Sequence, residues 1–434
     1  MDCNWEKTSL ADVSEKIDYG FTASATDKNT GTKFLRITDI QNGFVQWNDV
    51  PFCEIDSSSK SKYLLKDGDI VVARTGNSTG ENYLFQGESF AVFASYLIRF
   101  RVNKQIVDPS YVWRCMRSSS WRNFVRGSKT GSAQAGANAM VLGRFEFEYP
   151  PLHEQKAIAE IFRTLDEKIE LNQKNNECLE EIAKALFKSW FIDFLPVRAK
   201  SEGLSTGLPE DISNLFPDSF EDSELGGKPR GWRICHLDQL LDLKKNLISP
   251  NENPQELFDH YSIPAFDDRM KPTKDIGLTI DSNKFLLTEN VFLVSKLNPD
   301  CPRVWLPSKT KTRRCIASTE FMVCQPKKEV GIPFAYCLIK SYKITQQMIS
   351  MVTGTSSSHQ RLRPEDFRSI TSVRPNDQLF EIFSNAVSPI LEKLLLIREE
   401  NNLLTEYQNV LLPKLISGQI KIPDAEKMLD EVGI

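Results

Sequence analysis

The feature that most constrains the fold of this chain of 434 residues is an internal repeat. The strings KYLLKDGDIVVAR and KFLLTENVFLVSK, at 62–74 and 284–296, share an apolar rhythm and a terminal cation at an offset of 222 residues. Three shorter pairs follow in the same order at nearly the same offset: 93–95 with 316–318, 130–132 with 353–355, and 158–162 with 379–383. A duplicated segment of this length marks its own boundaries, so we expect one folding unit that is used twice.

The hydrophobic pattern divides each copy into two parts. Residues 1–150 and 231–375 contain short apolar runs broken by Gly, Pro, Asn and Asp, which is typical of α+β domains. The segments after them place apolar residues alternately three and four positions apart, which is the spacing of a coiled-coil seam. We therefore predict mixed domains at 1–150 and 231–375, long helices at 151–195 and 376–418, a linker at 196–230 and a C-terminal tail at 419–434.

Two long helices in one chain can pair antiparallel if the mixed domains lie at opposite ends. The expected fold class is therefore α+β: two similar mixed α/β domains separated by two long antiparallel coiled-coil helices, with an internal pseudo-two-fold repeat. The predicted seam consists of Ile158, Ile161, Leu165, Ile169, Asn172, Asn176, Leu179, Ile182 and Leu186 in the first helix, and of Phe380, Phe383, Val387, Ile390, Leu394, Ile397, Asn401 and Leu404 in the second.

Three asparagines and one proline interrupt the apolar seam. Buried amides at Asn172, Asn176 and Asn401 would select one register and one partner helix. The alternative is that these positions are solvated where the helices fray. Pro389 has no backbone N–H, so we expect it either to kink the second helix or to make it start late.

The net charge of the whole chain conceals an uneven distribution. The 54 basic and 58 acidic side chains give a net charge of −4, which alone argues against a phosphate-rich partner. The two mixed domains, however, carry +1 and +6, whereas residues 151–230 and 376–434 carry −6 and −5. Basic stretches at 99–129 and 296–314, interleaved with Trp113, Trp121 and Trp305, favour nucleic-acid binding, although solvated helix faces give the same pattern.

Several classes of protein are disfavoured by what the sequence lacks. The nine cysteines and four histidines have neither disulfide-framework nor metal-ligand spacing, so we expect no bound metal. Met1 is not followed by a basic stretch and an apolar core, and no apolar run is long enough to span a bilayer. We therefore expect a cytoplasmic protein without a membrane partner.

Catalytic motifs are missing as well. Gly80 is followed by Glu81 where a phosphate-binding loop needs Lys, and no GxGxxG follows a predicted strand. The string at 149–152, Tyr-Pro-Pro-Leu, departs from the Asn/Asp-Pro-Pro-aromatic tetrad of amino-methyltransferases at both ends. Carboxylates with a lysine, as a nuclease needs, are only loosely spaced in the linker. We therefore expect no catalytic residues and no cofactor in this chain.

Three further segments carry a family resemblance. They are EYPPLHEQKAIAEIFRTLDEKIELNQKNNECLEEIAKALFKSWFIDF at 148–194, FPDSFEDSELGGKPRGW at 216–232 and LLPKLISGQI at 411–420. Together they strongly resemble the DNA-specificity subunit of type I restriction-modification enzymes, and the similarity extends over nearly the whole chain. The resemblance implies two target-recognition domains, at 1–150 and 231–375, each recognising one half of a split double-stranded DNA site.

The same resemblance implies the partners. The helices would serve as a spacer and as the docking surface for modification subunits, two of them in the expected complex. Those subunits would bring S-adenosylmethionine and methylate adenine at N6. Restriction subunits would join them and cleave DNA in a reaction that needs ATP and magnesium. The chain itself would be the non-catalytic subunit of a phage-defence system.

Candidate DNA-binding residues follow from the repeat and from the resemblance. A small, flexible loop after a predicted strand could bring Arg74 and Asn77 to base edges, because Arg suits guanine and Asn suits adenine in the major groove. Lys296 and Asn298 hold the corresponding place in the second copy. The predicted set is Arg74, Thr75, Asn77, Ser78, Thr79, Arg122, Arg126, Lys129, Thr130, Ser132 and Gln134 in the first copy, and Lys296, Asn298, Arg303, Lys311, Arg313, Arg314, Ser357, His359, Gln360 and Arg361 in the second.

Two other classes of function stay open on the sequence alone. The chain could be a coiled-coil scaffold that binds only proteins, since the predicted loops could equally be turns closed by their own Ser and Asn side chains. It could also be a self-sufficient methyltransferase or nuclease with an unrecognised site. Salt-dependent binding of duplex DNA and binding of S-adenosylmethionine by the purified chain distinguish these alternatives.

Overall fold

The computed structural model describes residues 5–41, 43–88, 90–128, 137–224, 226–308, 313–352 and 360–430. The chain forms two compact units. Unit 1 consists of Met1–Glu170 and Leu403–Ile434, and unit 2 of Leu171–Asn402. Each unit contains a mixed domain together with part of both long helices, because side chains of those helices pack into both cores. The sequence analysis instead predicts each mixed domain and each long helix as a separate, continuous segment of the chain.

Unit 1 is built around a four-stranded antiparallel sheet. Its strand order is β2 (Ser14–Tyr19), β9 (Leu97–Val102), β6 (Asp69–Ala73) and β7 (Asn82–Leu84). Every residue of β6 is buried, since Ile70 and Val72 belong to one core cluster and Val71 and Ala73 to another on the opposite face. A strand covered on both faces has no polar alternation, which explains its continuous apolar sequence.

Smaller elements complete unit 1. Three strand pairs flank the main sheet: β1 (Glu6–Ser9) with β10 (Glu146–Tyr149), β3 (Lys33–Leu35) parallel to β8 (Ala91–Phe93), and β4 (Ile40–Gln41) with β5 (Phe44–Val45). The short helices are η1 (Ile37–Asp39), α1 (Ser57–Tyr63), α2 (Pro109–Cys115), α3 (Ser119–Ser128), α4 (Ala139–Gly143) and α13 (Ile422–Asp430). Asp56 and Asp108 cap α1 and α2 by accepting backbone N–H groups of the first turn.

Unit 2 repeats the strand order of unit 1. Its antiparallel sheet runs β14 (Leu241–Lys244), β22 (Phe321–Pro326), β19 (Phe292–Ser295) and β20 (Val304–Trp305). A second sheet runs β15 (Leu247–Ile248), β18 (Lys284–Leu286), β21 (Arg314–Ala317), β16 (Leu257–Tyr261) and β17 (Thr273–Ile276). Parallel pairing of β16 with β21 matches that of β3 with β8, and β13 (Arg233–His236) pairs with β23 (Thr371–Arg374) as β1 does with β10. The sequence repeat is therefore also a repeat of topology.

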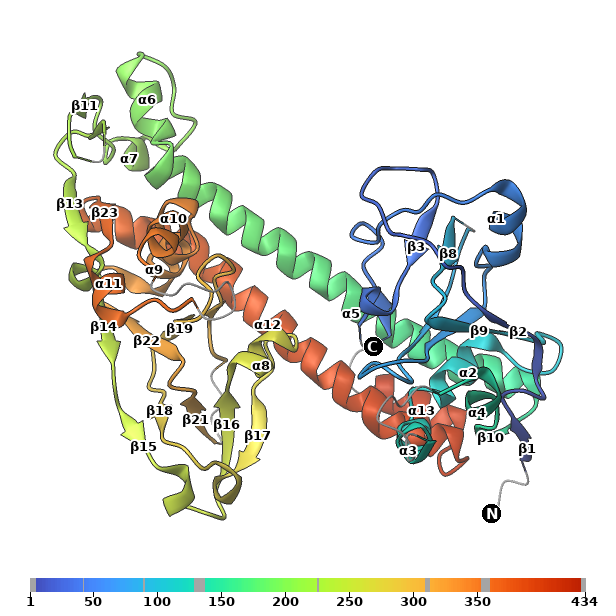
Figure 1. The fold of residues 1–434 in the computed structure, drawn as a ribbon. Coiled ribbons are helices and arrows are strands. Elements are labelled where there is room, and N and C mark those ends of the chain that lie inside the picture. Colours follow the sequence, from blue (N-terminus) through green and yellow to red (C-terminus); the bar gives the residue numbers. More distant parts are fainter. Residues whose placement is uncertain are drawn as a thin grey trace. The chain divides into compact units, whose positions relative to one another are not determined.

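The remaining elements of unit 2 are helices and one short hairpin (Figure 1). Helix α9 (Gly331–Ile339) shares a core cluster with β19, β22 and the long helix α12 (Asp377–Ile416). The others are α6 (Leu195–Ser201), α7 (Glu210–Ser213), η3 (Leu237–Gln239), η4 (Pro250–Glu252), α8 (Ile263–Asp267), η5 (Gly277–Thr279), α10 (Tyr342–Ser350), α11 (Pro364–Ser369) and the hairpin of β11 (Phe220–Glu221) with β12 (Lys228–Pro229).

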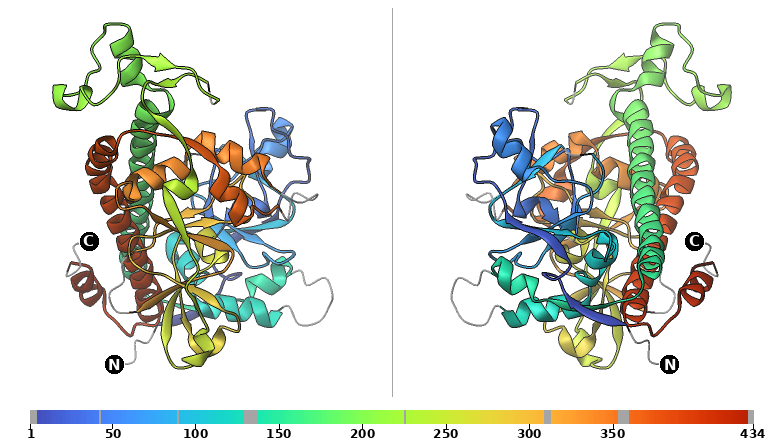
Figure 2. Two further views of the ribbon diagram at one scale, coloured as in Figure 1. Left: turned by 90° about the vertical axis from the view of Figure 1, so that its left-hand side faces the viewer. Right: turned by 90° about the vertical axis from the view of Figure 1, so that its right-hand side faces the viewer.

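The long helices are α5 (Leu152–Phe187), of 36 residues, and α12 (Asp377–Ile416), of 40 residues. Helix α5 ends in a π-helical turn, η2 (Lys188–Ile192). The two helices run alongside each other within each unit (Figure 2). In unit 2 they are antiparallel, since Asn172 contacts Asn401 whereas Phe187 contacts Phe383.

The seam of these helices differs in part from the prediction. Asn172 is only 4% exposed and donates its side-chain amide to Asn401 Oδ1 at 2.9 Å, so the predicted buried seam amide is confirmed at this position and the alternative that it is solvated is wrong. Pro389 does not delay the start of α12, which begins at Asp377 and continues through it. Ile182, predicted in the seam, is 50% exposed, and Ala183 is buried in its place.

Candidate nucleic-acid interface

In unit 1 the predicted loop begins directly after β6, and its first residue is held by three backbone partners. The Arg74 backbone N–H donates to Tyr96 O at 3.1 Å, and the Ala137 N–H donates to Arg74 O at 3.0 Å. The side chain adds a third contact, from Arg74 Nε to Ser95 O at 3.0 Å. The loop, the β8–β9 turn and the segment that begins at 137 therefore meet at this arginine.

The rest of this loop is fixed on helix α3. Trp121 Nε1 donates to Gly80 O at 2.8 Å, and a Cβ at Gly80 would lie 2.7 Å from the side chain of Val125. Gly80 also has a φ of 95°, so both its conformation and its neighbour require glycine. Thr79 is buried and donates its hydroxyl to Gly76 O at 2.7 Å, which gives it a structural role in the turn. Asn77, between these anchors, is exposed.

Helix α3 presents two of the predicted cations next to this anchor. Arg122 and Arg126 are exposed, whereas Trp121 and Val125 on the other face are buried. Residues four apart on a helix share one face, so the two guanidinium groups lie on one side of α3. The loop is anchored on the buried face of α3, whereas these two arginines lie on its exposed face.

Unit 2 repeats these contacts around Lys296, which follows β19. The Lys296 backbone N–H donates to Glu320 O at 2.9 Å, and the Leu362 N–H donates to Lys296 O at 2.8 Å. Its Nζ donates to Thr319 O, as Arg74 Nε does to Ser95 O. The same arrangement of three segments therefore occurs in both units.

Two segments of the second copy that hold predicted residues lie together, one at Asn298 and one at Gln360 and Arg361. The Asn298 N–H donates to Gln360 O at 3.0 Å, and Leu297 forms a strand-like bridge with Arg361. Asn298 has a left-handed φ of 49°, which Asn tolerates better than most residues. Lys296 is partly buried, and this burial, with the charges of Arg361 and Lys245 adding to it, lowers the pKa of Lys296.

The other predicted arginines of unit 2 form ion pairs with carboxylates. Arg303 makes a two-point contact with Asp267, at 2.7 and 3.0 Å. Arg313 pairs with the buried Asp259 at 2.9 Å. The remaining two pairs are Arg314 with Glu256 at 3.2 Å and Arg361 with Glu320 at 2.8 Å.

Two of the other predicted positions are described by the structure and seven are not. Thr75 and Ser78 lie partly buried in the loop between Arg74 and Gly80. The following lie outside the described residues: Lys129, Thr130, Ser132, Gln134, Lys311, Ser357 and His359. Contact with DNA stays a prediction for every residue of the set.

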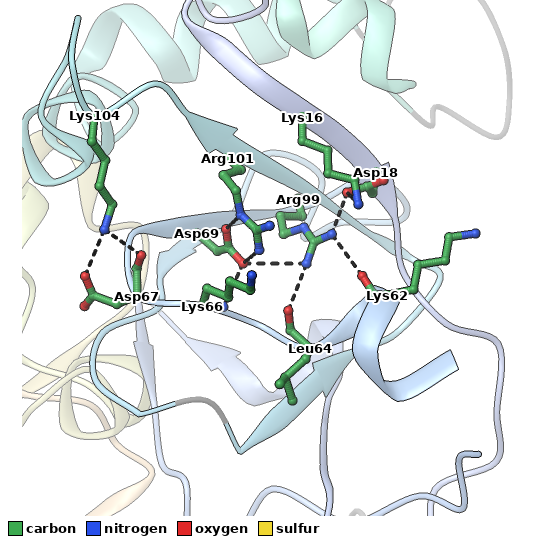
Figure 3. Close-up of polar contacts among 10 residues, drawn as sticks. All are labelled: Lys16, Asp18, Lys62, Leu64, Lys66, Asp67, Asp69, Arg99, Arg101 and Lys104. Carbon is green, nitrogen blue, oxygen red and sulfur yellow. Dashed lines mark hydrogen bonds and ion pairs between the residues drawn. The ribbon is translucent and has the colours of Figure 1, made fainter. Parts of the chain in front are cut away.

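The basic stretch at 99–129 is not one continuous surface patch. Arg99 is fully buried and contacts Asp18 at 2.5 Å, while Arg101 makes a two-point contact with Asp69 at 2.6 and 2.7 Å (Figure 3). Arg114 is buried against Asp166. The three interleaved tryptophans, Trp113, Trp121 and Trp305, are core residues. Of the predicted DNA-binding residues in this stretch that the structure describes, Arg122 and Arg126 are exposed.

Two exposed tyrosines lie beside Arg74 and are not in the predicted set. Tyr19 is 43% exposed and Tyr96 is 58% exposed. Tyr19 is the last residue of β2, and its ring centroid lies 5.1 Å from the Arg74 guanidinium carbon. The signal that could have indicated Tyr19 is a large aromatic residue at the end of a strand that remains exposed at the surface.

Within the described ranges, no group of three or more His, Cys, Asp or Glu side chains is arranged to hold a metal ion. Among the helices formed by those same residues, none has both the length and the apolar character that crossing a bilayer requires.

The cysteines of the described segments include five that are buried, and burial raises the pKa of Cys235 to about 11.

Comparisons with known proteins show which proteins this chain resembles. Residues 3–181 match the family model described as the type I restriction modification DNA specificity domain. A specificity subunit of the type I restriction enzyme HindI from Haemophilus influenzae is 25% identical over 96% of this chain and 100% of its own length. The MjaIX specificity subunit from Methanocaldococcus jannaschii is 23% identical over 74% of this chain and 72% of its own.

A solved structure supports the fold. The S subunit of a type I restriction-modification system from M. genitalium aligns with a TM-score of 0.54 at 15% identity, over 95% of this chain and 96% of that one. Together with the family match, these relatives confirm the resemblance inferred from the motifs. Residues 3–181 thus match the type I restriction modification DNA specificity domain, and the chain over nearly its whole length is similar to proteins named as specificity subunits of type I restriction enzymes.

Proposed function

We propose that this chain recognises a bipartite site in double-stranded DNA, each mixed domain recognising one half. The observation that carries the proposal is the duplicated arrangement around Arg74 and Lys296. In both units a cationic residue follows the central strand, and its side chain donates to the carbonyl of a neighbouring turn. Its backbone carbonyl accepts an N–H from a third segment, that of Ala137 in unit 1 and that of Leu362 in unit 2. Two equivalent loop clusters in one chain are what a DNA site with two halves requires.

The proposal includes partners. The acidic helical segments 151–230 and 376–434 are poor surfaces for DNA and suit protein partners. We place there the docking of two modification subunits, which use S-adenosylmethionine to methylate adenine N6, and of restriction subunits that use ATP and magnesium. This chain would bind none of those cofactors itself, and the complex would act in the cytoplasm, where the DNA is.

Co-expression with the cognate modification subunit tests the proposal. Methylome sequencing of a host without other adenine methylation should show N6-methyladenine at one two-part motif with a fixed gap. Arg74→Ala should weaken base discrimination at one position of one half about 5- to 160-fold, because a bidentate arginine contributes about 1–3 kcal/mol of discrimination. The other half should be unchanged. A methylome without a two-part motif would contradict the proposal.

The protein-only scaffold makes the opposite prediction. The purified chain would then show no salt-dependent mobility shift with duplex DNA, whereas a DNA-binding chain loses affinity steeply as salt rises. Binding of S-adenosylmethionine by the purified chain alone would instead favour a self-sufficient methyltransferase. Isothermal titration of the isolated chain with that cofactor therefore separates this third alternative from the first.

The helices provide a second test, because in this proposal they set the gap between the half-sites. Removing residues 170–176 from α5 together with 397–403 from α12 deletes matched heptads around the Asn172–Asn401 contact. A heptad is nearly two helical turns, so the helix faces are kept. The gap should shorten by about three base pairs, since seven residues span about 10 Å. Methylome sequencing measures it, and an unchanged gap would reject the helices as the spacer.

A further inference from the structure

Arg74 is held at the surface of unit 1 by an aromatic ring. Its guanidinium carbon lies 5.1 Å from the centroid of the Tyr19 ring, the geometry of a cation–π contact. The ring is 43% exposed, so the contact is at the surface and not in the core. Arg74 Nε is bonded to Ser95 O at 3.0 Å, which fixes the inner edge of the guanidinium group.

The Tyr19 ring is itself fixed at both ends. Its backbone pairs with Ile98 in β9, and its hydroxyl accepts the Ala139 N–H at 3.1 Å. The preceding residue, Asp18, binds the buried Arg99 at 2.5 Å (Figure 3). Arg99 also donates to the carbonyls of Lys62 and Leu64, at the end of α1. The end of β2 is thus tied to the interior, and Tyr19 has little freedom to move away from Arg74.

This arrangement prepares the guanidinium group for one kind of contact. An arginine side chain loses much rotational freedom when it binds, and an arginine already fixed on one face and at Nε loses less. Its outer edge carries two parallel N–H donors, which match the O6 and N7 acceptors of guanine in the major groove. Adenine, thymine and cytosine do not present two acceptors in this place.

Unit 2 does not repeat the exposed ring. Strand β14 ends at Lys244, and the exposed Lys245 follows where Tyr19 stands in unit 1. Lys296 Nζ lies 5.7 Å from the ring of Phe285, which is only 9% exposed. The cation of unit 2 therefore has a buried ring beside it, and its Nζ is bonded to Thr319 O. The two units therefore differ at one position next to the cationic residue: Tyr19 stands there in unit 1 and Lys245 in unit 2.

We propose that Tyr19 is a positioning residue for DNA recognition, and that the Tyr19–Arg74 stack recognises a guanine in the half-site of unit 1. This inference rests on the proposed function and deepens it. The equivalent place in unit 2 has no such stack and recognises no base in this way. Substitutions of Tyr19 therefore alter the preference at one position of one half-site.

The test uses the full chain in complex with its modification subunit. Methylation rates are measured on duplexes that carry each of the four bases at every position of the motif. Tyr19→Leu should lower the preference for guanine at one position by about five- to tenfold, because it removes the ring but keeps an apolar side chain. Tyr19→Phe should retain the preference. Arg74→Lys, which keeps the charge but loses the two-pronged edge, should lose it at the same position.

The measured quantity is a ratio of rates for two duplexes, so it does not depend on how much of a variant is folded. Tyr342→Leu replaces another exposed tyrosine, on α10 of unit 2, and should leave every ratio unchanged. Unaltered base preference in Tyr19→Leu, or an equal change in both half-sites, would overturn the inference. The proposed function fails separately, if the wild-type complex methylates no two-part motif.

Discussion

Replacing Asp69 with Asn should destabilise unit 1 by about 3–5 kcal/mol, the usual cost of breaking a buried ion pair by removing one partner. The Asp69 carboxylate is 1% exposed and binds Arg101 at 2.6 and 2.7 Å (Figure 3). Arg99 lies 3.6 Å away, and the Lys66 N–H donates to the same carboxylate at 2.8 Å. The amide would leave the charge of Arg99 without one of its two carboxylates in the interior.

Asp67→Asn is the matched control. Asp67 stands two residues earlier and pairs with Lys104, but both side chains are more than half exposed. An exposed pair contributes about 0–1 kcal/mol, so this variant should be close to wild type. Hydrogen exchange of peptides from β6 and β9 measures the difference in unit 1 specifically, because these strands lie in its core. Equal protection in the two variants would contradict a stabilising role for the buried network.

The duplication of the mixed domain could be predicted from the sequence, although the strand order within it could not. The match of 62–74 with 284–296 falls on β6 and β19, the central strands of equivalent sheets. Such strands retain their apolar residues because both faces are covered. The small residues after them mark turns, which is why the position of the loops at Arg74 and Lys296 was also predictable.

The partners of the charged residues could not be predicted in this way. Arg99 and Arg101 appeared in a basic stretch with a single acid, yet Asp18 and Asp69 reach them from neighbouring strands. Counting charges along the chain detects only partners that are near in sequence. Pairing between strands brings together residues that are 81 and 32 positions apart in the sequence. Cations of a basic stretch can therefore be buried in ion pairs with distant carboxylates.

The predicted seam is wrong at Ile182, near the end of α5, where the helix packs against α9 as well as α12. An α-helix drifts by about 20° per heptad against a strict seven-residue repeat, so a seam extrapolated over the length of α5 moves off the buried face. Ile182 is exposed, and Ala183 and Phe187 are buried instead. Phe187 packs against Phe334 of α9 as well as Phe383 of α12, so a third element determines which face is covered.

Replacing Glu180 with Gln should destabilise unit 2 by about 3–5 kcal/mol near pH 7. The Glu180 carboxylate binds Lys340 Nζ at 2.6 Å and Arg398 Nη2 at 2.9 Å, and all three side chains are less than a fifth exposed. These contacts join α5, the end of α9 and α12 within the unit. Without the carboxylate, two cations would remain buried and unpaired.

This loss should depend on pH. Burial alone would raise the pKa of Glu180, but the charges of Lys340 and Arg398 outweigh it and hold that pKa below its ordinary value. A carboxyl group with a lowered pKa contributes its full stabilisation above the ordinary value of about 4.3, and loses it as the pH falls through the lowered pKa. The difference between wild type and Glu180→Gln should therefore be constant from about pH 6 to 7 and shrink in acid.

The neighbouring residue supplies the control. Glu181 is 71% exposed and pairs with Lys184, so Glu181→Gln should change stability by less than about 1 kcal/mol at any pH. Urea unfolding at pH 7, 5 and 3.5, followed by hydrogen exchange of α9 and α12 peptides, separates the two variants. A difference between wild type and Glu180→Gln that grows as the pH falls would show that Lys340 and Arg398 do not stabilise the ionised carboxylate. In that case the cluster would hold α5, α9 and α12 together by packing alone.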